Sequence, residues 1–212
     1  ANLVPGSITR AYNISSSLKK MPKQIEKKLK AVHAGVMPNF DNISGSDFQN
    51  LKDNFALLSI GYFHAAKTAN YEFRLWSDDG SLLYINGEPI LDHDGHHGTS
   101  MRQTKLRLEE GYHEFRLEYF QGGGGKFLSW NYKPEGGESW AVVPSAVISH
   151  NKEDRKMIGN LTLPMSVMTQ LPGDKMPVAG VHPSFDVSQA KPKDFEPKVG
   201  GLDFLADGRI VV

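Results

Sequence analysis

The chain has 212 residues, 39% of them hydrophobic, which is enough to bury one sizeable core with a smaller element or tail attached. Lys and Arg total 24 and Asp and Glu also total 24, so no net charge recruits nucleic acid or an acidic membrane surface, and we expect neither as a partner. The absence of cysteine excludes disulfides, thiolate metal sites and a cysteine nucleophile.

The N-terminus gives an expectation about location. The first residues, ANLVPGSITRAY, lack the basic and then apolar profile of a signal peptide, and the chain has no run of about 18 apolar residues that would predict membrane insertion. An N-terminal alanine is what signal-peptide cleavage often leaves, although a trimmed chain would begin in the same way. We therefore expect a secreted, periplasmic or cell-surface protein.

Residues 15–35 predict a short N-terminal helix. Ile25, Leu29 and Val32 recur at helical spacing, Pro22 suits a first turn, and Gly35 is a residue at which a helix can end. We interpret the lysines of this stretch as a solvated helix face, because the chain as a whole is neutral.

From residue 55 onward the hydrophobic pattern has a period of two. Alternation over residues 71–76 and 114–119 is typical of half-buried strands, and Asn86-Gly87 between two apolar runs predicts a tight hairpin. Further strand candidates are residues 55–65, 102–108, 126–132 and 140–148. About eight or nine short strands with little helix predict an all-β antiparallel sandwich or barrel.

The composition and the hydrophobic pattern of the sequence change again after about residue 150. Residues 151–212 are rich in proline and lack sustained periodicity, so we interpret them as a linker or extended strap that ends in a hairpin around Asp207-Gly208. Residues 1–150 are then the main domain. A strap would pack the following side chains onto that domain: Met165, Val167, Leu171, Phe185 and Phe195. The other interpretation makes the hairpin the start of a following domain.

Asp78 and Asp79 are adjacent acidic residues at the end of a predicted strand. Successive side chains of a strand point to opposite faces, so both carboxylates can serve one site only if the backbone bends. Adjacent carboxylates repel unless a cation lies between them, and oxygen ligands suit calcium. Gln121 and the glycines at 122–125 would add a side-chain oxygen and closely approaching carbonyls. The sequence thus predicts a calcium site, and the alternative is a hydrogen-bonded turn without an ion.

The string YEFRLWSDDGSLLYINGEPILDHDGHHG, followed by LEEGYHEFRLEYFQGGGG and LSW, resembles the PA14 domain family over residues 5–150. The resemblance implies a β-sandwich or barrel of the kind found in adhesins, glycosidases, toxins and cell-surface proteins. It also implies carbohydrate binding, in which a cis peptide joins the two aspartates, both ligate calcium, and vicinal hydroxyls of the sugar complete the coordination.

By position, the resemblance implies these calcium ligands: Asp78, Asp79, Gln121 and the carbonyls of Gly123 and Gly125. Lectin members often carry an additional Asn or Asp in the loop that is all glycine here. Trp76, beside the site, is the aromatic candidate for contact with the sugar, whereas Trp130 and Tyr132 are interpreted as core.

Residues 92–98, DHDGHHG, allow two interpretations. The Asp and His side chains could form a zinc cluster. The family pattern instead contains an Asp-Gly-His turn at this place, whose side chains brace the loop, and we favour bracing. Asp94 or His96 would then have a secondary role in lining the sugar pocket.

Catalysis is not expected. Two neighbouring aspartates on a shared ion are too close, and too well ionised, to divide the acid and base roles of a glycosidase, and no other catalytic motif is present. We expect a calcium-dependent carbohydrate-binding module in a larger protein. The alternative is a structural or protein-interaction module that binds no sugar and orients an attached enzyme or assembly. Residues 173–212 also resemble the start of a sugar-dehydrogenase-like β-propeller.

Overall fold

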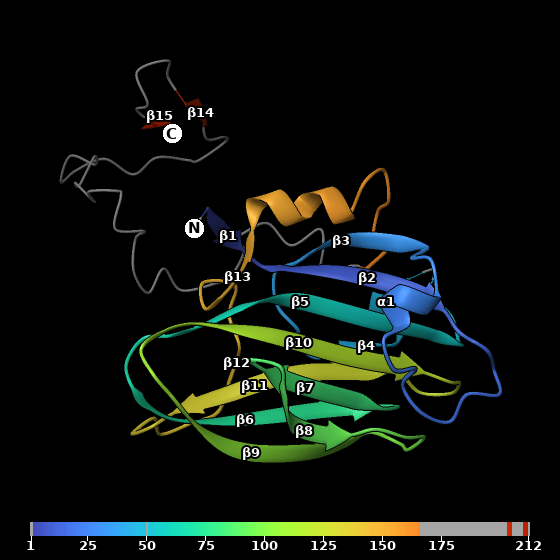
Figure 1. The fold of residues 1–212 in the computed structure, drawn as a ribbon, viewed down its shortest axis with the longest axis horizontal. Coiled ribbons are helices and arrows are strands. Elements are labelled where there is room, and N and C mark those ends of the chain that lie inside the picture. Colours follow the sequence, from blue (N-terminus) through green and yellow to red (C-terminus); the bar gives the residue numbers. More distant parts are fainter. Residues whose placement is uncertain (1, 50, 166–202, 205–209, 212) are drawn as a thin grey trace, which may run out of the picture. The chain divides into compact units, whose positions relative to one another are not determined.

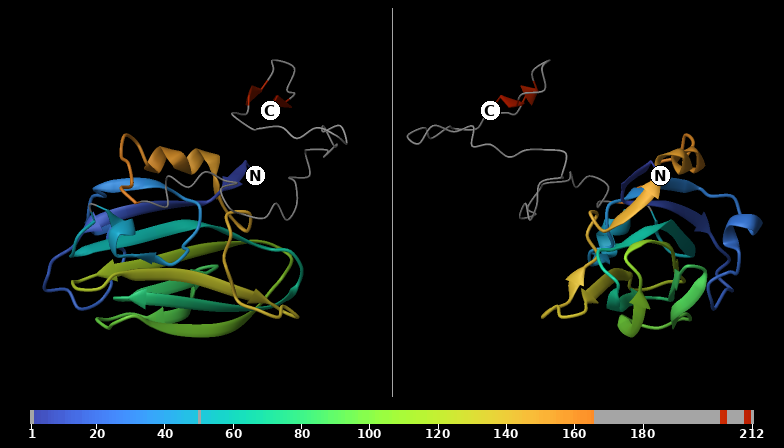
Figure 2. Two further views of the ribbon diagram at one scale, coloured as in Figure 1. Left: turned by 180° about the vertical axis from the view of Figure 1, so that it is seen from behind. Right: turned by 60° about the vertical axis from the view of Figure 1, so that its left-hand side comes forward.

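The computed structural model describes residues 2–49, 51–165, 203–204 and 210–211. It separates into two compact units, Ala1–Leu171 and Pro172–Val212. In the first unit, antiparallel strands form two sheets that lie face to face around one core (Figures 1 and 2). This confirms the predicted all-β antiparallel fold. Among the described residues, none of the helices has the length and apolar character needed to cross a bilayer.

The larger sheet has eight strands, in the order β1-β13-β5-β10-β7-β8, with β2 beside β5 and β3 beside β2. The bounds are β1 Leu3–Pro5, β2 Ser7–Asn13, β3 His33–Met37, β5 Phe55–Ala65, β7 Ser81–Ile85, β8 Glu88–His93, β10 Gly111–Gln121 and β13 Ile148–Asn151. β5 and β10 form its longest pairing, with Phe55 opposite Gln121 and Ala65 opposite Gly111.

The smaller sheet has five strands, in the order β12-β11-β6-β9, with β4 beside β11. The bounds are β4 Ile43–Ser44, β6 Ala69–Asp78, β9 Ser100–Leu108, β11 Phe127–Pro134 and β12 Ala141–Val142. The described residues of the unit also form three short helices: α1 Ile25–Lys28, η1 Gly45–Phe48 and η2 Lys152–Met157. The strand predicted over 140–148 is divided between β12 and β13 by a turn in which the Val147 amide donates to the carbonyl of Pro144.

Aromatic side chains from both sheets meet in the core. The rings of Phe63 on β5 and Phe73 on β6 have centroids 5.1 Å apart, and those of Phe115 on β10 and Trp130 on β11 are 4.9 Å apart. All four side chains are at most 3% exposed. Burial of this apolar area is the main stabilising contribution to such a sandwich, and it places Trp130 in the core as predicted.

The predicted hairpin is confirmed in the larger sheet. Asn86 and Gly87 join β7 to β8 with φ angles of 51° and 83°, the positive values that a two-residue hairpin turn needs. β8 therefore returns directly alongside β7, and the chain leaves it at His93 close to the start of β7 at Ser81. This return brings the segment after β8 to the same end of the sandwich as Asp78.

The predicted N-terminal helix is much shorter than residues 15–35. Only α1 is helical, because Leu29 is extended and the Val32 amide donates to the carbonyl of Ala11, which leads the chain into β3. Gly35, expected to end the helix, is a strand residue opposite Thr9. Leu29 is 39% exposed, so it does not form the expected apolar face with Ile25, which is buried.

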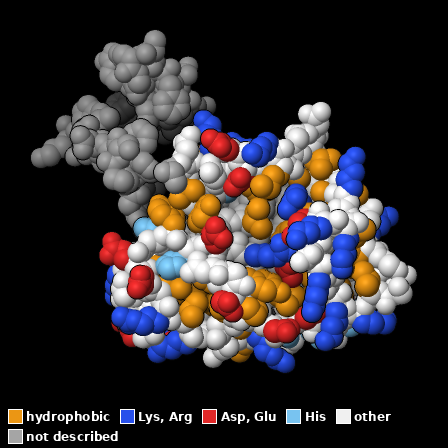
Figure 3. Space-filling view, viewed as in Figure 1, with side chains coloured by type: hydrophobic (Ala, Val, Ile, Leu, Met, Phe, Trp, Pro, Cys, Tyr) orange, Lys and Arg blue, Asp and Glu red, His pale blue; other side chains and the backbone are white. Residues whose placement is uncertain are grey.

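The segment around α1 covers part of the outer face of the larger sheet with a second, smaller apolar cluster. Its buried members are Tyr12, Met21, Ile25, Ala56, Leu58, Leu82 and Phe120. Arg116 of β10 anchors the segment through an ion pair with Glu26, at 2.9 Å, and also pairs with Glu118 of its own strand. On the face seen in Figure 3, charged side chains of both signs are interspersed with apolar ones.

Two described residues after β13 contribute to the core of the first unit. Leu163 and Met165 are 5% and 1% exposed and belong to the main cluster. The other side chains expected of a strap, Val167, Leu171, Phe185 and Phe195, lie outside the described residues. In the second unit, β14 Asp203–Phe204 pairs with β15 Ile210–Val211. The domain boundary near residue 150 stays a prediction.

Candidate functional site

Asp78 and Asp79 lie where the chain passes from β6 of the smaller sheet to β7 of the larger sheet. Asp78 is the last residue of β6, and the peptide bond between the two aspartates is cis, as the resemblance implies. The side chains are largely buried, with residue exposures of 9% and 4%. Among the described residues no Lys or Arg lies within 4.0 Å of either carboxylate, and the nearest basic group is Nδ1 of His96, 3.9 Å from Oδ1 of Asp79. Buried carboxylates without such partners favour a bound cation.

Two loops converge on the pair through hydrogen bonds to its carboxylates. From the segment after β8, Thr99 Oγ1 donates to Asp78 Oδ2 at 3.2 Å, and the His97 amide donates to Asp79 Oδ1 at 3.1 Å. From the loop after β10, the Gly122 amide donates to Asp79 Oδ2 at 2.9 Å. The structure therefore brings together the aspartate pair and the glycine loop, which are some 40 residues apart in the sequence.

The glycines of the loop have different roles. A Cβ at Gly125 would lie 2.7 Å from Oδ2 of Asp78, and a Cβ at Gly122 would collide with the ring of His96. Gly124 has a φ of +91°, which side chains rarely allow. Gly123 has room for a side chain, because its Cβ would come no closer than 3.9 Å to Asp53. The close approach of the loop to Asp78 thus depends on Gly125.

Gln121 and Tyr119 lie beneath the pair. The Tyr119 hydroxyl donates to the main-chain oxygen of Asp78 at 2.6 Å and lies 2.9 Å from Oε1 of Gln121. Burial, and then the charges of Asp78 and Asp79, raise the pKa of Tyr119 well above its usual value, so the hydroxyl keeps its proton. One proton cannot serve two acceptors, while the buried Nε2 of Gln121 has no partner.

Turning the Gln121 amide by 180° removes both difficulties. Nε2 then donates to the oxygen of Tyr119, and Oε1 takes the position at which the amide group has no partner. A buried oxygen that lacks a donor is suited to face a cation. In this orientation Gln121 has a buried oxygen without a donor, and its role as an oxygen ligand stays a prediction.

The residues present fit a calcium ion. Calcium accepts carboxylate, amide and backbone carbonyl oxygens together, and the carboxylates of Asp78 and Asp79, the side chain of Gln121 and the loop carbonyls are all of these types. Gly123 and Gly125 belong to the loop that meets Asp78. Within the described residues no group of three or more His, Asp and Glu side chains could hold a metal, so the zinc interpretation of residues 92–98 has no support.

Side chains of the segment 92–98 are engaged in local hydrogen bonds. Asp94 Oδ1 accepts from the Met21 amide at 2.8 Å, and His96 Nε2 lies 2.9 Å from the carbonyl of Leu18. Both contacts tie the loop to the N-terminal segment before α1. Sequence reasoning missed this docking, which no local pattern indicates. His96 lies 3.9 Å from Asp79, and contact of Asp94 or His96 with a ligand stays a prediction.

Within the segment 92–98, the rings of His93 and His97 stack with their centroids 3.9 Å apart. His93 is 5% exposed and its Nε2 lies 3.1 Å from Oγ of Ser100. Burial, followed by the neighbouring His97, lowers the pKa of His93 to about 4, so this ring is neutral near pH 7. The stacked rings lie next to the backbone that presents the His97 amide to Asp79.

Trp76 lies on the outer face of the smaller sheet, in a groove of about 420 Å³. The lining residues are Asn42, Arg74, Trp76, Thr99, Phe127, Asn131 and Trp140. Thr99 links the groove to the aspartate pair, because it also donates to Asp78. From the sequence only Trp76 was a candidate for contact with a sugar, because most of the other residues that line the groove come from four other segments of the chain.

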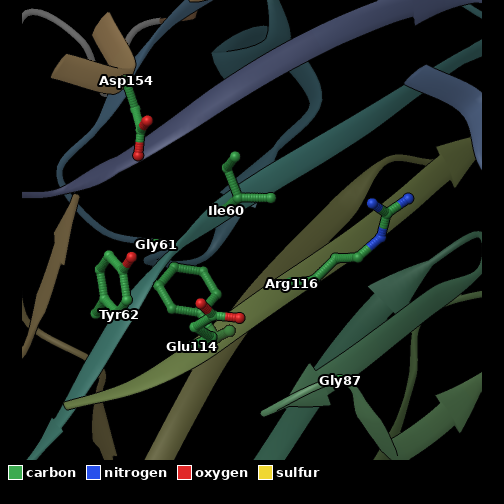
Figure 4. Close-up of a pocket in the computed structure, with 8 residues that line it drawn as sticks. Ile60, Gly61, Tyr62, Gly87, Glu114, Arg116 and Asp154 are labelled. Atoms are coloured by element: carbon green, nitrogen blue, oxygen red, sulfur yellow. The ribbon is translucent and has the colours of Figure 1, made fainter. Parts of the chain in front are cut away.

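A second hollow, of about 280 Å³, lies on the outer face of the larger sheet (Figure 4). It is lined by Ile60, Gly61, Tyr62, Gly87, Glu114, Phe115, Arg116 and Asp154. The charged groups labelled in Figure 4 do not point toward one another, and Arg116 is engaged with Glu26 and Glu118. Without convergent polar groups this hollow is a weaker candidate for a site.

The fold and the site define a class of protein: an antiparallel β-sandwich with two adjacent aspartates and a glycine loop at one end. A model of the PA14 domain matches residues 4–145, and the chain belongs to this family. No curated protein matches the chain. The comparisons give no support to the propeller resemblance of the C-terminal segment, most of which lies outside the described residues.

Solved structures with the same fold include three informative ones. The PA14 domain of the MpAFP antifreeze protein is 18% identical, with a TM-score of 0.60 over 71% of this chain and 93% of that one. A PA14 sugar-binding domain from an RTX adhesin is 21% identical, with a TM-score of 0.58 over 69% and 99%. A subtype-switched Epithelial Adhesin 9 to 1 A domain from Candida glabrata, in complex with beta-lactose, is 13% identical, with a TM-score of 0.58 over 75% and 93%. At these identities the likeness shows the fold.

Proposed function

We propose that the chain is a calcium-dependent carbohydrate-binding module. The observation that carries the proposal is the convergence of two buried carboxylates, without a Lys or Arg partner among the described residues, on a glycine loop that approaches Asp78 closely. The adhesin domains of the same fold, one a sugar-binding domain by name and one in complex with beta-lactose, support the choice of carbohydrate as ligand.

In this proposal each part of the site has one task. The carboxylates of Asp78 and Asp79, the Gln121 side chain and the carbonyls of Gly123 and Gly125 hold the ion. A bound calcium ion supplies open coordination positions that the vicinal hydroxyls of a sugar fill. The amides of His97 and Gly122 orient the Asp79 carboxylate. We infer a binding module and not an enzyme, because both carboxylates are committed to one ion.

The place of the module in a larger protein is part of the proposal. The adhesin origin of two similar structures supports a secreted, periplasmic or cell-surface location. The second candidate function is a module that orients neighbouring domains without binding sugar. The observation in its favour is that the carboxylates of Asp78 and Asp79 already accept hydrogen bonds from three groups, as those of a structural turn would.

A glycan array decides between the two functions. The chain is applied in millimolar calcium and again in EDTA, together with Asp79→Asn, which keeps the size of the side chain and removes its charge. We expect binding of at least one glycan in calcium and its loss in EDTA and in the variant. A blank array in calcium across neutral and acidic sugars would favour the interaction module.

A further inference from the structure

The outer face of β6 runs from the aspartate pair into the groove around Trp76. Alternate residues of a strand face the same side, and because Phe73 and Leu75 are buried in the core, Arg74, Trp76 and Asp78 share the outer side. Four residues at about 3.3 Å each place Arg74 about 13 Å along the strand from Asp78. The distance from Arg74 to Asp78 is therefore longer than one sugar ring.

Aromatic and polar side chains form the far end of the groove. The guanidinium carbon of Arg74 lies 3.8 Å from the centre of the Trp140 ring, and Nη2 of Arg74 donates to Gln103 Oε1 at 2.9 Å. These contacts hold Trp140 over the sheet. Asn131 lies opposite Arg74 on β11 and also lines the groove. The half-buried Trp76 and Trp140 thus leave part of their surfaces open beside amide and guanidinium groups.

Two residues that line the groove are neighbours of the aspartate pair. Thr99 lines the groove and donates to Asp78 Oδ2, and Phe127 lines it directly opposite Asp78 in the strand register. A molecule bound at the pair would therefore lie next to the groove. Sugar rings offer apolar faces that suit aromatic side chains and hydroxyl edges that suit amides and guanidinium groups.

We propose that this groove binds the second and following sugar residues of a glycan whose first residue is held at Asp78 and Asp79. The inference rests on the proposed function and deepens it: the ligand is an oligosaccharide, and a single sugar fills only part of the site. Trp76 and Trp140 contact ring faces, while Arg74 and Asn131 donate to hydroxyls further along the chain.

The test compares chain lengths in calcium. The probes are arrays of one to four linked residues of glucose, galactose, mannose and N-acetylglucosamine. Trp140→Ala and Asn131→Ala change the groove at a distance from the aspartate pair. Tyr112→Ala is the matched control, because Tyr112 is an aromatic residue of β10, is 56% exposed and does not line the groove. Trp140→Phe keeps an aromatic ring and is the rescue variant, and melting temperatures show that each variant is folded.

For the wild type we expect the tetrasaccharide of the recognised sugar to bind about tenfold more tightly than the monosaccharide. Trp140→Ala and Asn131→Ala should each weaken tetrasaccharide binding about threefold to tenfold and leave monosaccharide binding unchanged. Trp140→Phe should keep most of the preference, and Tyr112→Ala all of it. Two results would overturn the proposed role of the groove but not the proposed function. One is equal affinity for glycans of all four lengths, and the other is a preference for the tetrasaccharide that neither Trp140→Ala nor Asn131→Ala reduces. Absence of any glycan binding overturns the proposed function and the groove with it.

Discussion

A single methyl group at Gly125 tests how the site is built. Its Cβ would lie 2.7 Å from Oδ2 of Asp78, 0.7 Å short of the 3.4 Å at which ordinary contact begins. Metal ligands must keep their distances to within about 0.2 Å, so a shift of this size removes one carboxylate from coordination or moves the loop away. Gly125→Ala should therefore weaken calcium binding at least about tenfold. Gly123→Ala, whose Cβ has no neighbour closer than 3.9 Å, is the control.

Thermal unfolding measures the effect. If the dissociation constant is about 0.1 mM, as in extracellular calcium modules, 10 mM calcium stabilises the wild type by about 2.7 kcal/mol and raises its melting temperature by about 5 to 10 °C. A tenfold weaker Gly125→Ala gains about 1.4 kcal/mol, and its rise is about half as large. Gly123→Ala should match the wild type. A full calcium response in Gly125→Ala would refute the role given to this close approach.

Two further predictions concern stability. Because the pKa of His93 is lowered to about 4 by burial, the unfolded chain takes up a proton between about pH 6.5 and pH 4 that the folded chain does not. The free energy of unfolding should thus fall by up to about 3 kcal/mol as the pH drops through this range. In His93→Gln this part of the pH dependence of the free energy of unfolding should be lost. An unchanged pH dependence in the variant would contradict its assignment to His93. Arg116→Met leaves Glu118, 5% exposed, without its cation and also removes the ion pair to Glu26 of α1, so it should cost about 3 kcal/mol in urea unfolding. A loss below about 1 kcal/mol would show that these ion pairs contribute little to stability.

The long strands with clear alternation or a sustained apolar run could be predicted from the sequence, and several shorter strands could not. β5 has the predicted bounds, and β6 and β10 extend the predicted stretches by a few residues. β2 was missed because Ser7 and Thr9 are buried polar residues, and the hydroxyl of Thr9 bonds to Ser59 at 2.6 Å. Because polar residues take buried positions of β2, the strand shows no apolar period.

The site was predictable where residues adjacent in sequence carry the chemistry. Asp78 and Asp79 stand out as adjacent acids, but the different roles of Gly123 and Gly125 depend on where a distant carboxylate lies. Trp140 belongs to a segment predicted as a plain strand, and its place in the groove depends on Arg74 of another strand. Contacts between distant segments of this kind leave no local pattern.

Calcium titration by isothermal calorimetry is the most direct test of the site at Asp78 and Asp79. The wild-type chain should bind one calcium ion, with a dissociation constant in the range of about 0.1 to 1 mM that extracellular modules show. Asp78→Asn and Asp79→Asn should each abolish the uptake while the chain stays folded in EDTA. Absence of calcium uptake by the wild type at millimolar concentration, or equal uptake by the Asp79→Asn variant, would contradict the assignment of the ion to this pair.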